Sequence, residues 1–411
     1  MALVISGVIG FALAMIVVNP GWSSLLDPDY RRAMSRFEES LRLAHAKYVD
    51  ENQSDFSGLA DRAIDGMVSG LDRHSSYYPP LEYKAFQDDT HRRYLGVGVM
   101  IRKVDKGVLL TKVFAKGPAE EAGLKVGEFI LEVNGESVDG LKLDEISAKV
   151  KGEQGTFVDL FLLAYDGQKR TVRVRRDEIE ISSVDNAGVD EDGTGYLHLI
   201  QFTGRTAQEV EEALSELRSK GMERLILDLR DNSGGLLSAA IEVADLFLEK
   251  DRLIVSVKGR KGVNLRDFRS TTSQLISEPL VVLLNEGSAS ASEIVAGAFS
   301  VLDRAPLVGE QSYGKGSVQT IFPLSDGSGL RLTTAMYFLP DGSTIHEQGI
   351  EPDVHVSCSE ANETKLRIQR YGDPNLTSQE FEELFGFSRI LDVQKSKALD
   401  LLTGESNTTG Q

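Results

Sequence analysis

The sequence predicts a multidomain α/β protein, in which helical segments flank a small β-rich module and a larger α/β core. Three observations predict this class. Apolar residues recur at helical spacing near both ends of the chain. Short strand patterns separated by glycine turns fill residues 95–176. From residue 177 to residue 357, buried-strand patterns alternate with amphipathic helices, which is typical of a sheet covered by helices.

The chain begins with an uncharged apolar stretch, residues 2–18, that ends at Asn19-Pro20. Its 17 residues are at the short limit for a membrane span and slightly long for the core of a signal peptide. No basic residue precedes it, and Val17–Pro20 is a poor cleavage site. We therefore interpret residues 1–25 as an uncleaved signal anchor, with a removed signal peptide as the alternative. Both interpretations predict a periplasmic or otherwise extracytoplasmic protein, and the first predicts anchoring in the inner membrane.

Residues 26–85 are predicted to form a helical segment. One face of its first helix contains Phe37, Leu41, Leu43 and Ala44, and one face of its second contains Leu59, Ala63, Ile64, Met67 and Leu71. At the other end of the chain, residues 358–411 form a polar tail with helical patterns at 379–385 and 388–402. Residues 403–411 are too small and polar to order themselves.

The β-rich module, residues 86–176, opens with a glycine loop, Tyr94-Leu95-Gly96-Val97-Gly98, at the start of a strand predicted over Val97–Ile101. Backbone N–H groups converge in such a loop and can hold a terminal carboxylate, while the neighbouring strand edge pairs with a peptide. Leu95, Gly96, Val97 and Gly98 are therefore candidate peptide-binding residues. A plain hairpin is the alternative.

The predicted core, residues 177–357, contains a serine-rich turn between a buried strand and a helix. The apolar run Pro279–Leu284 precedes the turn Asn285–Glu293, and Ile294–Phe299 continues the helix. A serine at a helix N-terminus lies where unpaired N–H groups favour developing negative charge. The same residues also fit a capping box with Ser290 as the N-cap and Glu293 at N3, so capping alone is the competing interpretation.

A lone lysine, Lys315, lies between two glycines 25 residues after Ser290. The residues before it nearly match a phosphate-binding loop, but that motif needs Ser or Thr after the lysine and then a helix. Here Gly316 follows, and Ser317–Phe322 is predicted to be a strand. A surface lysine in a turn is the other alternative. Ser290 and Lys315 together suggest a serine nucleophile with a lysine base.

Composition excludes several classes of function. A formal net charge of −18 argues against nucleic acid as the main partner, because neutralising phosphates needs an excess of Lys and Arg. The single cysteine, Cys358, excludes an intrachain disulfide and a cysteine-based metal site. The six histidines lack the spacing of a metallopeptidase site. We expect no metal and no cofactor.

The module and the core together resemble a known enzyme family. Gly117–Leu124, Gly127-Glu128 and Asn134-Gly135 resemble a PDZ domain of the bacterial protease type. Residues 30–357 as a whole resemble the carboxyl-terminal processing proteases, also called tail-specific proteases. The motifs that carry this resemblance are Leu71–Tyr77, Asp228–Leu236, Gly287–Glu293, Gly314–Gln319 and Gly349–Asp353. One departure is Arg73, where the family usually has proline.

The resemblance implies that Ser290 is the nucleophile, Lys315 the general base, and Gln319 a residue that holds the lysine from the same strand. It implies an oxyanion hole formed by the backbone N–H groups of Ala291 and Gly235, although Gly234-Gly235 could also be only a tight turn. A lysine with the reference pKa of roughly 10.4 is protonated at neutral pH and cannot act as a base, so Lys315 must be largely desolvated in the active state.

The resemblance further implies a serine endopeptidase that cleaves proteins near their C-termini through an acyl-enzyme, after the PDZ domain binds the tail. Expected partners are proteins or peptides with apolar C-termini, and an adaptor protein and a homo-oligomer are both compatible with the sequence. Two other hypotheses stay open. The protein could be a membrane-tethered PDZ scaffold with an inactive core, or its core could catalyse another acyl transfer such as thioester hydrolysis. A weaker possibility is a Ser-His-Asp mechanism using His198.

Overall fold

The computed structural model describes residues 27–91, 94–104, 107–114, 116–164, 167–179, 182–271, 275–371 and 376–404. The predicted signal anchor therefore lies outside the described residues, as do residues 405–411 of the predicted disordered end, whereas Thr403 and Gly404 end a helix. None of the described helices is long and apolar enough to cross a membrane. The chain divides into two compact units, of which the first runs to Phe86 and includes Gln319–Thr333 and the second contains Gln87–Val318 and the residues from Thr334 onward.

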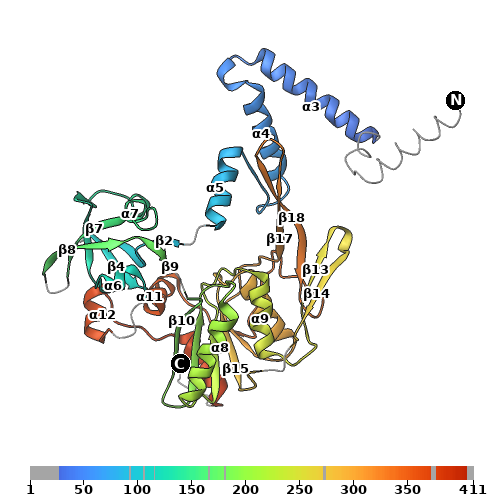
Figure 1. Cartoon of the computed structure of the whole chain (residues 1–411). Helices are drawn as coiled ribbons and strands as arrows, with labels where there is room; N and C mark the ends of the chain where they lie inside the picture. Colours follow the sequence, from blue (N-terminus) through green and yellow to red (C-terminus); the bar gives the residue numbers. More distant parts are fainter. Residues whose placement is uncertain are drawn as a thin grey trace. The chain divides into compact units, whose positions relative to one another are not determined.

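The first unit contains the N-terminal helices and the tip of a long hairpin (Figure 1). Its elements are α3 (Pro28–Lys47), η1 (Glu51–Gln53), α4 (Phe56–Ser69), β1 (Ser76–Tyr78), the first part of α5 (Pro80–His91), most of β17 (Ser317–Pro323) and the start of β18 (Gly329–Phe338). Residues 319–333, which the sequence assigns to the core, join this unit because β1 pairs antiparallel with β18. The first predicted helix is present as α3, whose apolar residues Phe37 and Leu43 are exposed and which has no buried residue.

The β-rich module is a sheet in the order β3-β4-β5-β7-β8. Its elements are β3 (Val99–Val104), β4 (Gly107–Val113), α6 (Pro118–Glu121), β5 (Phe129–Val133), β6 (Glu136–Ser137), α7 (Leu143–Val150), β7 (Phe157–Leu163) and β8 (Lys169–Arg175). The strand predicted over Val97–Ile101 is interrupted, because Gly98 has a left-handed φ of 81°. Before this break, β2 (Tyr94–Gly96) pairs instead with β9 (Asp177–Ile179).

The core is built on a six-stranded sheet in the order β10-β11-β12-β15-β16-β19. Its strands are β10 (Val184–Val189), β11 (Thr194–Leu199), β12 (Arg224–Asp228), β15 (Leu280–Leu284), β16 (Leu307–Gly309) and β19 (Val354–His355). Only β10 is antiparallel to its neighbour in this sheet. A second sheet in the core joins β13 (Leu253–Gly259), β14 (Asn264–Arg269) and the end of β18.

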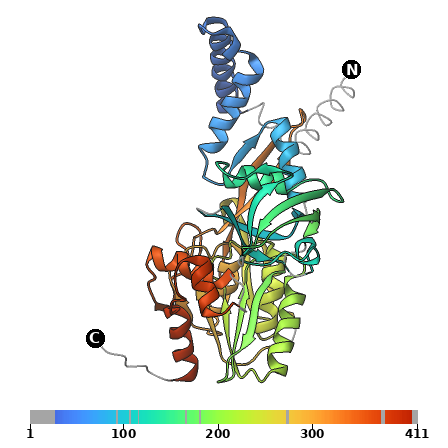
Figure 2. The same cartoon turned by 90° about the vertical axis from the view of Figure 1, so that its left-hand side faces the viewer.

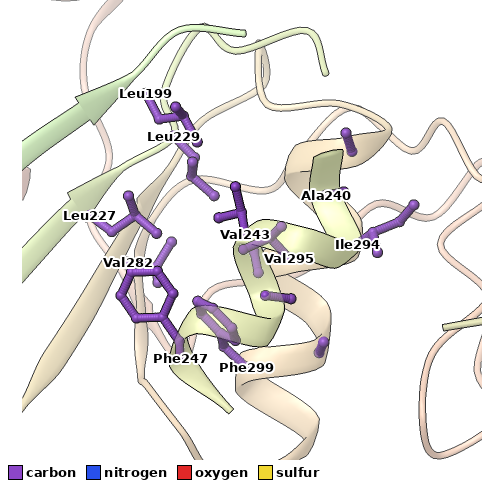
Figure 3. Close-up of a cluster of buried hydrophobic side chains, with 14 of the residues drawn as sticks. Leu199, Leu227, Leu229, Ala240, Val243, Phe247, Val282, Ile294, Val295 and Phe299 are labelled. Atoms are coloured by element: carbon purple, nitrogen blue, oxygen red, sulfur yellow. The ribbon is translucent and has the colours of Figure 1, made fainter. Parts of the chain in front are cut away.

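Helices cover both faces of the six-stranded sheet. Side chains alternate along β12, so Leu225 and Leu227 enter the main core while Ile226 packs on the opposite face. Figure 3 shows Leu227 in the main core. The main core is closed by α8 (Thr206–Ser219), α9 (Leu237–Phe247) and α10 (Ala291–Val301). On the opposite face lies α13 (Val393–Thr403), red in Figure 2, which contributes Ala398. Burial on both faces explains why the central strands are continuous apolar runs.

Three helices lie in the part of the C-terminal tail that the structure describes. Two of them are α11 (Glu360–Tyr371) and α12 (Ser378–Phe385), of which the second agrees with the predicted 379–385. The next helix begins at Val393 rather than at residue 388, because the side chain of Asp392 caps it by accepting a hydrogen bond from the Lys395 amide.

Candidate active site

Three loops meet at the carboxyl ends of three adjacent parallel strands. The loop after β12 contains Gly234-Gly235, the loop after β15 contains Ser290, and the loop after β16 contains Lys315. Parallel strands end at the same edge of a sheet, and ligands of open α/β sheets bind outside that edge. The topology therefore brings together sequence segments that are separated by up to about 80 residues.

Ser290 is the N-cap residue of α10 and has φ 55° and ψ −109°. For a non-glycine residue such a backbone costs on the order of 1–3 kcal/mol and persists only where neighbours enforce it. Two of these neighbours are Ser288, whose hydroxyl donates to the Leu229 carbonyl (2.8 Å), and Ser292, whose hydroxyl donates to the Asn232 carbonyl (2.8 Å). One half of the predicted capping box forms, because the Ser290 amide donates to Glu293 Oε2. The Ser290 hydroxyl makes no side-chain cap hydrogen bond and is half-buried, so capping does not account for this hydroxyl.

The glycine pair lies directly against the serine turn. A Cβ on Gly234 would be 2.6 Å from the Ala289 carbonyl oxygen, and a Cβ on Gly235 would be 2.0 Å from the Phe202 carbonyl oxygen. Both glycines have left-handed φ values, 97° and 149°. Only glycine fits at these positions. Within the described chain, the amides of Gly235 and Ala291 donate to no protein acceptor.

Glu293 connects the serine turn to the lysine loop. Its Oε2 accepts hydrogen bonds from the Ser290 amide (2.7 Å) and the Lys315 amide (2.9 Å). Its Oε1 accepts from the Ser312 hydroxyl (2.6 Å) and the Gly314 amide (2.7 Å). The side chain is fully buried. One carboxylate thus sets the backbone positions of both Ser290 and Lys315.

The lysine loop needs its two glycines. Gly314 has φ 90°, and a Cβ on Gly316 would be 2.6 Å from the His346 amide nitrogen. The half-buried Lys315 precedes β17, so the prediction that it shares a strand with Gln319 is wrong. Gln319 lies in β17 in the first unit, where its Nε2 donates to Thr333 Oγ1 (3.3 Å). In the described structure, Ser290 Oγ and Lys315 Nζ are not hydrogen-bonded to each other.

The Gly349–Asp353 motif supports the same loop. A Cβ on Gly349, which has φ 68°, would be 2.4 Å from the Ser312 carbonyl oxygen. The Ile350 amide donates to Ser312 Oγ (2.7 Å), and the Ser312 amide donates to the Ile350 carbonyl (3.1 Å). Ser312 therefore connects this motif to Glu293 and to the lysine loop.

Comparison with known proteins identifies the family. The chain is 35% identical over 409 residues to a carboxy-terminal-processing protease of Bartonella bacilliformis, which covers 95% of this chain and 93% of the relative. The chain belongs to the carboxy-terminal processing proteases. It is also 33% identical over 353 residues to carboxy-terminal processing protease CtpA of Bacillus subtilis, covering 85% of this chain and 75% of that protein.

Family models place the two parts of this protease. Residues 193–356 match peptidase family S41, and residues 110–163 match the PDZ domain. A solved structure of a putative S41 protease from Bacteroides fragilis has the same fold, with a TM-score of 0.53, 17% identity, and coverage of 77% of this chain and 85% of the other. The predicted multidomain α/β class is confirmed, as is a PDZ domain beside a serine-type peptidase core.

His198 lies in a buried polar layer of the protease core. It is fully buried in β11, where it pairs with Asp228 of β12, and its Nδ1 is 3.6 Å from Asp185 Oδ2. Burial lowers the pKa of His198, which favours the neutral ring. No hydrogen bond or ion pair between His198 and Ser290 occurs in the described structure, so the geometry gives no support to a Ser-His-Asp mechanism.

A buried ion network beneath the glycine loop was missed as a group by sequence reasoning. Arg230 is fully buried and donates to Asp228 (2.6 Å), to Asp392 (2.8 Å) and to Gln394 (3.0 Å). Burial alone would raise the pKa of Asp228, but Arg230 outweighs it and holds that pKa well below its usual range. Asp228 and Arg230 lie in the Asp228–Leu236 motif, whereas Asp392 is more than 160 residues away and no local pattern indicates its role.

The candidate peptide-binding loop of the PDZ domain is fixed by its carbonyl groups. Leu95 and Gly96 end β2, and Val97 and Gly98 form the turn before β3. The Val97 carbonyl accepts from the Ala119 amide (2.8 Å), and the Gly98 carbonyl accepts from the Phe114 amide (3.0 Å).

The described residues contain no cluster of His, Cys, Asp and Glu that could hold a metal ion.

Proposed function

We propose that this protease is a serine endopeptidase that cleaves proteins near their C-termini through an acyl-enzyme, with Ser290 as nucleophile and Lys315 as general base. One observation carries the proposal: the buried Glu293 carboxylate accepts hydrogen bonds from the backbone amides of both Ser290 and Lys315. A nucleophile and its base must be held in a fixed relation, and a shared rigid acceptor supplies that relation.

The reaction follows from these positions. Ser290 Oγ attacks the carbonyl carbon of the scissile peptide, while its proton passes to neutral Lys315 Nζ. The electron pair of the carbonyl bond moves to its oxygen, which the amides of Ala291 and Gly235 stabilise. When the tetrahedral intermediate collapses, the C–N bond breaks and the leaving amine takes the proton from Lys315. Water then attacks the acyl-enzyme carbonyl carbon while its proton passes to Lys315. When this second tetrahedral intermediate collapses, the C–O bond to Ser290 breaks and Ser290 Oγ takes the proton from Lys315, which releases the carboxylic acid product and restores both residues.

Lys315 must be neutral to act as the base. It is half-buried, and a substrate chain that lies over it would remove water from it. Gln319 would hold the lysine, and its own position is set within the first unit by Thr333. The Thr333 amide in turn donates to the Ser75 hydroxyl (3.2 Å), which gives the Leu71–Tyr77 motif a structural role.

The PDZ domain would select the substrate. Its β3 is an edge strand of the sheet, so an extended peptide can add beside it. The turn formed by Leu95, Gly96, Val97 and Gly98 would hold the terminal carboxylate. Tails with small apolar ends are the proposed substrates, with an adaptor protein or a homo-oligomer as further partners. We propose that tail binding favours the active arrangement, which predicts that deleting residues 95–176 slows cleavage of a short internal peptide.

The localisation follows from the N-terminal stretch. Residues 2–18 would anchor the protease in the inner membrane with its catalytic domains in the periplasm or another extracytoplasmic space. Fractionation of cells that express the full chain tests this. Recovery in the membrane fraction with protease-accessible domains is expected, and recovery in the cytoplasm would contradict it.

Degradation of an unstructured protein with an apolar C-terminal tail tests the function. Wild-type protein should degrade it, whereas Ser290→Ala and Lys315→Ala should not, with unchanged circular dichroism in all three. Activity that survives Ser290→Ala would show that the nucleophile is wrongly assigned. Tail binding without cleavage by the wild type would support the inactive scaffold instead. A serine-reactive probe that labels the wild type but not Ser290→Ala gives an independent readout.

A further inference from the structure

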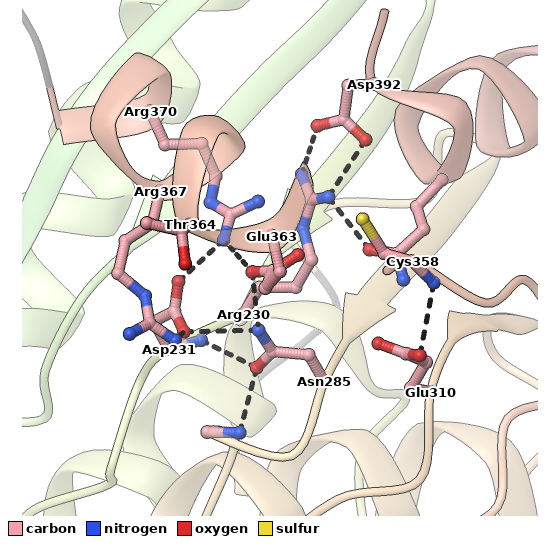
Figure 4. Close-up of polar contacts among 12 residues, drawn as sticks. Arg230, Asp231, Asn285, Glu310, Cys358, Glu363, Thr364, Arg367, Arg370 and Asp392 are labelled. Atoms are coloured by element: carbon pink, nitrogen blue, oxygen red, sulfur yellow. Dashed lines mark hydrogen bonds and ion pairs between the residues drawn. The ribbon is translucent and has the colours of Figure 1, made fainter. Parts of the chain in front are cut away.

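One face of the tail helix α11 contacts two of the three loops that form the candidate active site, those after β12 and β15 (Figure 4). Glu363, Arg367 and Arg370 lie at positions i, i+4 and i+7, so they share that face. Arg367 Nη2 donates to Asp231 Oδ1 (2.8 Å), and Arg370 Nη2 donates to Asp231 Oδ2 (2.6 Å). The carboxylate of Asp231 is therefore held between two guanidinium groups from the tail.

Asp231 begins the turn that leads to Gly234 and to Gly235, whose amide is proposed for the oxyanion hole. It has a left-handed φ of 59°, and Gly234 and Gly235, three and four residues later, also have positive φ. A backbone with this many sparsely populated conformations persists only where its surroundings fix it. The Asp231 side chain is only 8% exposed. Burial alone would raise the pKa of Asp231. The positive charge of Arg370 and the hydrogen bonds from Arg370, Arg367 and Asn285 outweigh burial and leave that pKa lowered.

Asn285 extends this connection to the nucleophile turn. Its Oδ1 accepts from the amides of Asp231 (2.9 Å) and Gly287 (3.0 Å). Its Nδ2 donates to Asp231 Oδ1 (3.1 Å) and to Glu363 Oε1 (3.2 Å). The first residue after β15 thus contacts the glycine loop and α11 at once. None of these side chains is hydrogen-bonded to Ser290 or Lys315 in the described structure.

We propose that Arg370, acting through Asp231, is a positioning residue that sets the Gly235 amide relative to Ser290, so that the C-terminal tail completes the oxyanion hole. This inference rests on the proposed function. An oxyanion hole acts on the tetrahedral intermediate and not on the bound substrate, so loss of alignment should lower kcat and leave KM nearly unchanged. The tail then contributes to the chemical step and not only to stability.

The test uses the full chain with Arg370→Gln, Arg370→Lys, Asp231→Asn and the double variant Arg370→Gln/Asp231→Asn. Arg389→Gln is the matched control, because Arg389 donates to the Leu376 carbonyl (3.0 Å) and packs on Phe381 within the same tail. Two readouts are measured: kcat and KM on an internally quenched peptide, and the affinity for a peptidyl boronic acid. The boronate forms a tetrahedral adduct with the serine and therefore reports the oxyanion hole directly.

The expected result for Arg370→Gln is a loss of kcat of roughly 10- to 100-fold, below the effect typical of deleting an oxyanion-hole donor outright. Boronate affinity should fall in parallel, KM should stay within about threefold, and Arg370→Lys should recover part of kcat. The losses in the double variant should be less than additive, because both substitutions remove the Arg370–Asp231 ion pair, although Asp231 also pairs with Arg367 and Arg370 with Glu363. Arg389→Gln should behave like the wild type.

Three results would overturn the inference while leaving the proposed function intact: Arg370→Gln and Asp231→Asn with wild-type kcat, a change in KM alone, or losses that add in the double variant. Wild-type protein without activity, or an active Ser290→Ala, would instead overturn the proposed function itself. If Arg370→Gln does not fold, Asp231→Asn, which preserves shape and removes only the charge, decides the question by the same two readouts.

Discussion

The clearest prediction concerns Glu293, whose carboxylate receives four hydrogen-bond donors and offers none. Glu293→Gln keeps the shape of the side chain and replaces one oxygen by an amide NH2 group. Whichever way the amide is oriented, its nitrogen faces two of the four donors. The substitution therefore tests the carboxylate as an acceptor, with little change in packing.

The magnitude follows from the identity of the four partners. With its nitrogen toward Ser290 and Lys315, the amide would oppose two backbone N–H groups that cannot reverse. With its nitrogen toward Ser312 and Gly314, it would oppose only the Gly314 amide, because the Ser312 hydroxyl can accept as well as donate. The second orientation is favoured and loses one hydrogen bond to a charged group, about 1.5–3 kcal/mol. If this deficit reaches the activation barrier, kcat/KM falls roughly 10- to 100-fold.

The assay is kcat/KM on an internally quenched peptide, together with the thermal unfolding midpoint. Glu293→Ala, which leaves all four donors without an acceptor, should be more damaging than Glu293→Gln. Glu286→Gln is the control, because Glu286 lies in the same turn and is exposed. A Glu293→Gln protein with kcat/KM within threefold of the wild type would refute the idea that this carboxylate aligns the nucleophile with its base.

Three further predictions follow from the same contacts. Gly235→Ala should lower kcat by at least roughly a hundredfold, because its Cβ would lie 2.0 Å from the Phe202 carbonyl oxygen. Leu236→Ala, at the exposed next position, serves as the control. A Gly235→Ala protein with wild-type activity would contradict the geometry. The pKa of Asp231 is lowered on folding, so the stability that its carboxylate adds to the folded protein is complete above about pH 4 and is lost as the pH falls through the lowered pKa. The acid unfolding curves of wild type and Asp231→Asn should therefore converge below about pH 4. Curves that stay parallel there would argue against this prediction. Burial raises the pKa of the Cys358 thiol to about 11. Iodoacetamide should therefore alkylate Cys358 slowly in the native protein at pH 7.5 and at the rate of a free thiol in the unfolded protein. Equal alkylation rates in the two states would contradict the raised pKa.

The sequence predicted those parts of the site that have a local pattern. Ser290 stands between an apolar strand and an apolar helix, and Lys315 stands between two glycines, so each is recognisable without its partners. The order of strands and helices in the core was predictable for the same reason, because burial on both faces makes β12 and β15 continuous apolar runs. Such signals depend on a few neighbouring residues.

The parts that were missed depend on contacts between distant segments. Glu293 was visible only as a capping residue, because the Ser312 and Gly314 donors come from the loop after a different strand. The same limit explains why Arg370 and Asp392 gave no signal in a tail whose helices look polar and unremarkable in sequence. The apolar face of α3 shows a further limit: the helix was predictable, but helical periodicity shows only that a face is apolar and not that anything covers it.

Two buried carboxylates solve the same physical problem on either side of the site. Ser290 and Asp231 both have left-handed backbones, and each belongs to a loop that would relax without external support. Glu293 accepts from the Ser290 amide and from the lysine loop, while Asp231 accepts from Asn285 and from the tail. A carboxylate suits this role because it offers about four acceptor sites and no donor. Each strained loop is thereby held by an anion that a second, distant segment also requires, so the geometry of the site depends on both segments being folded.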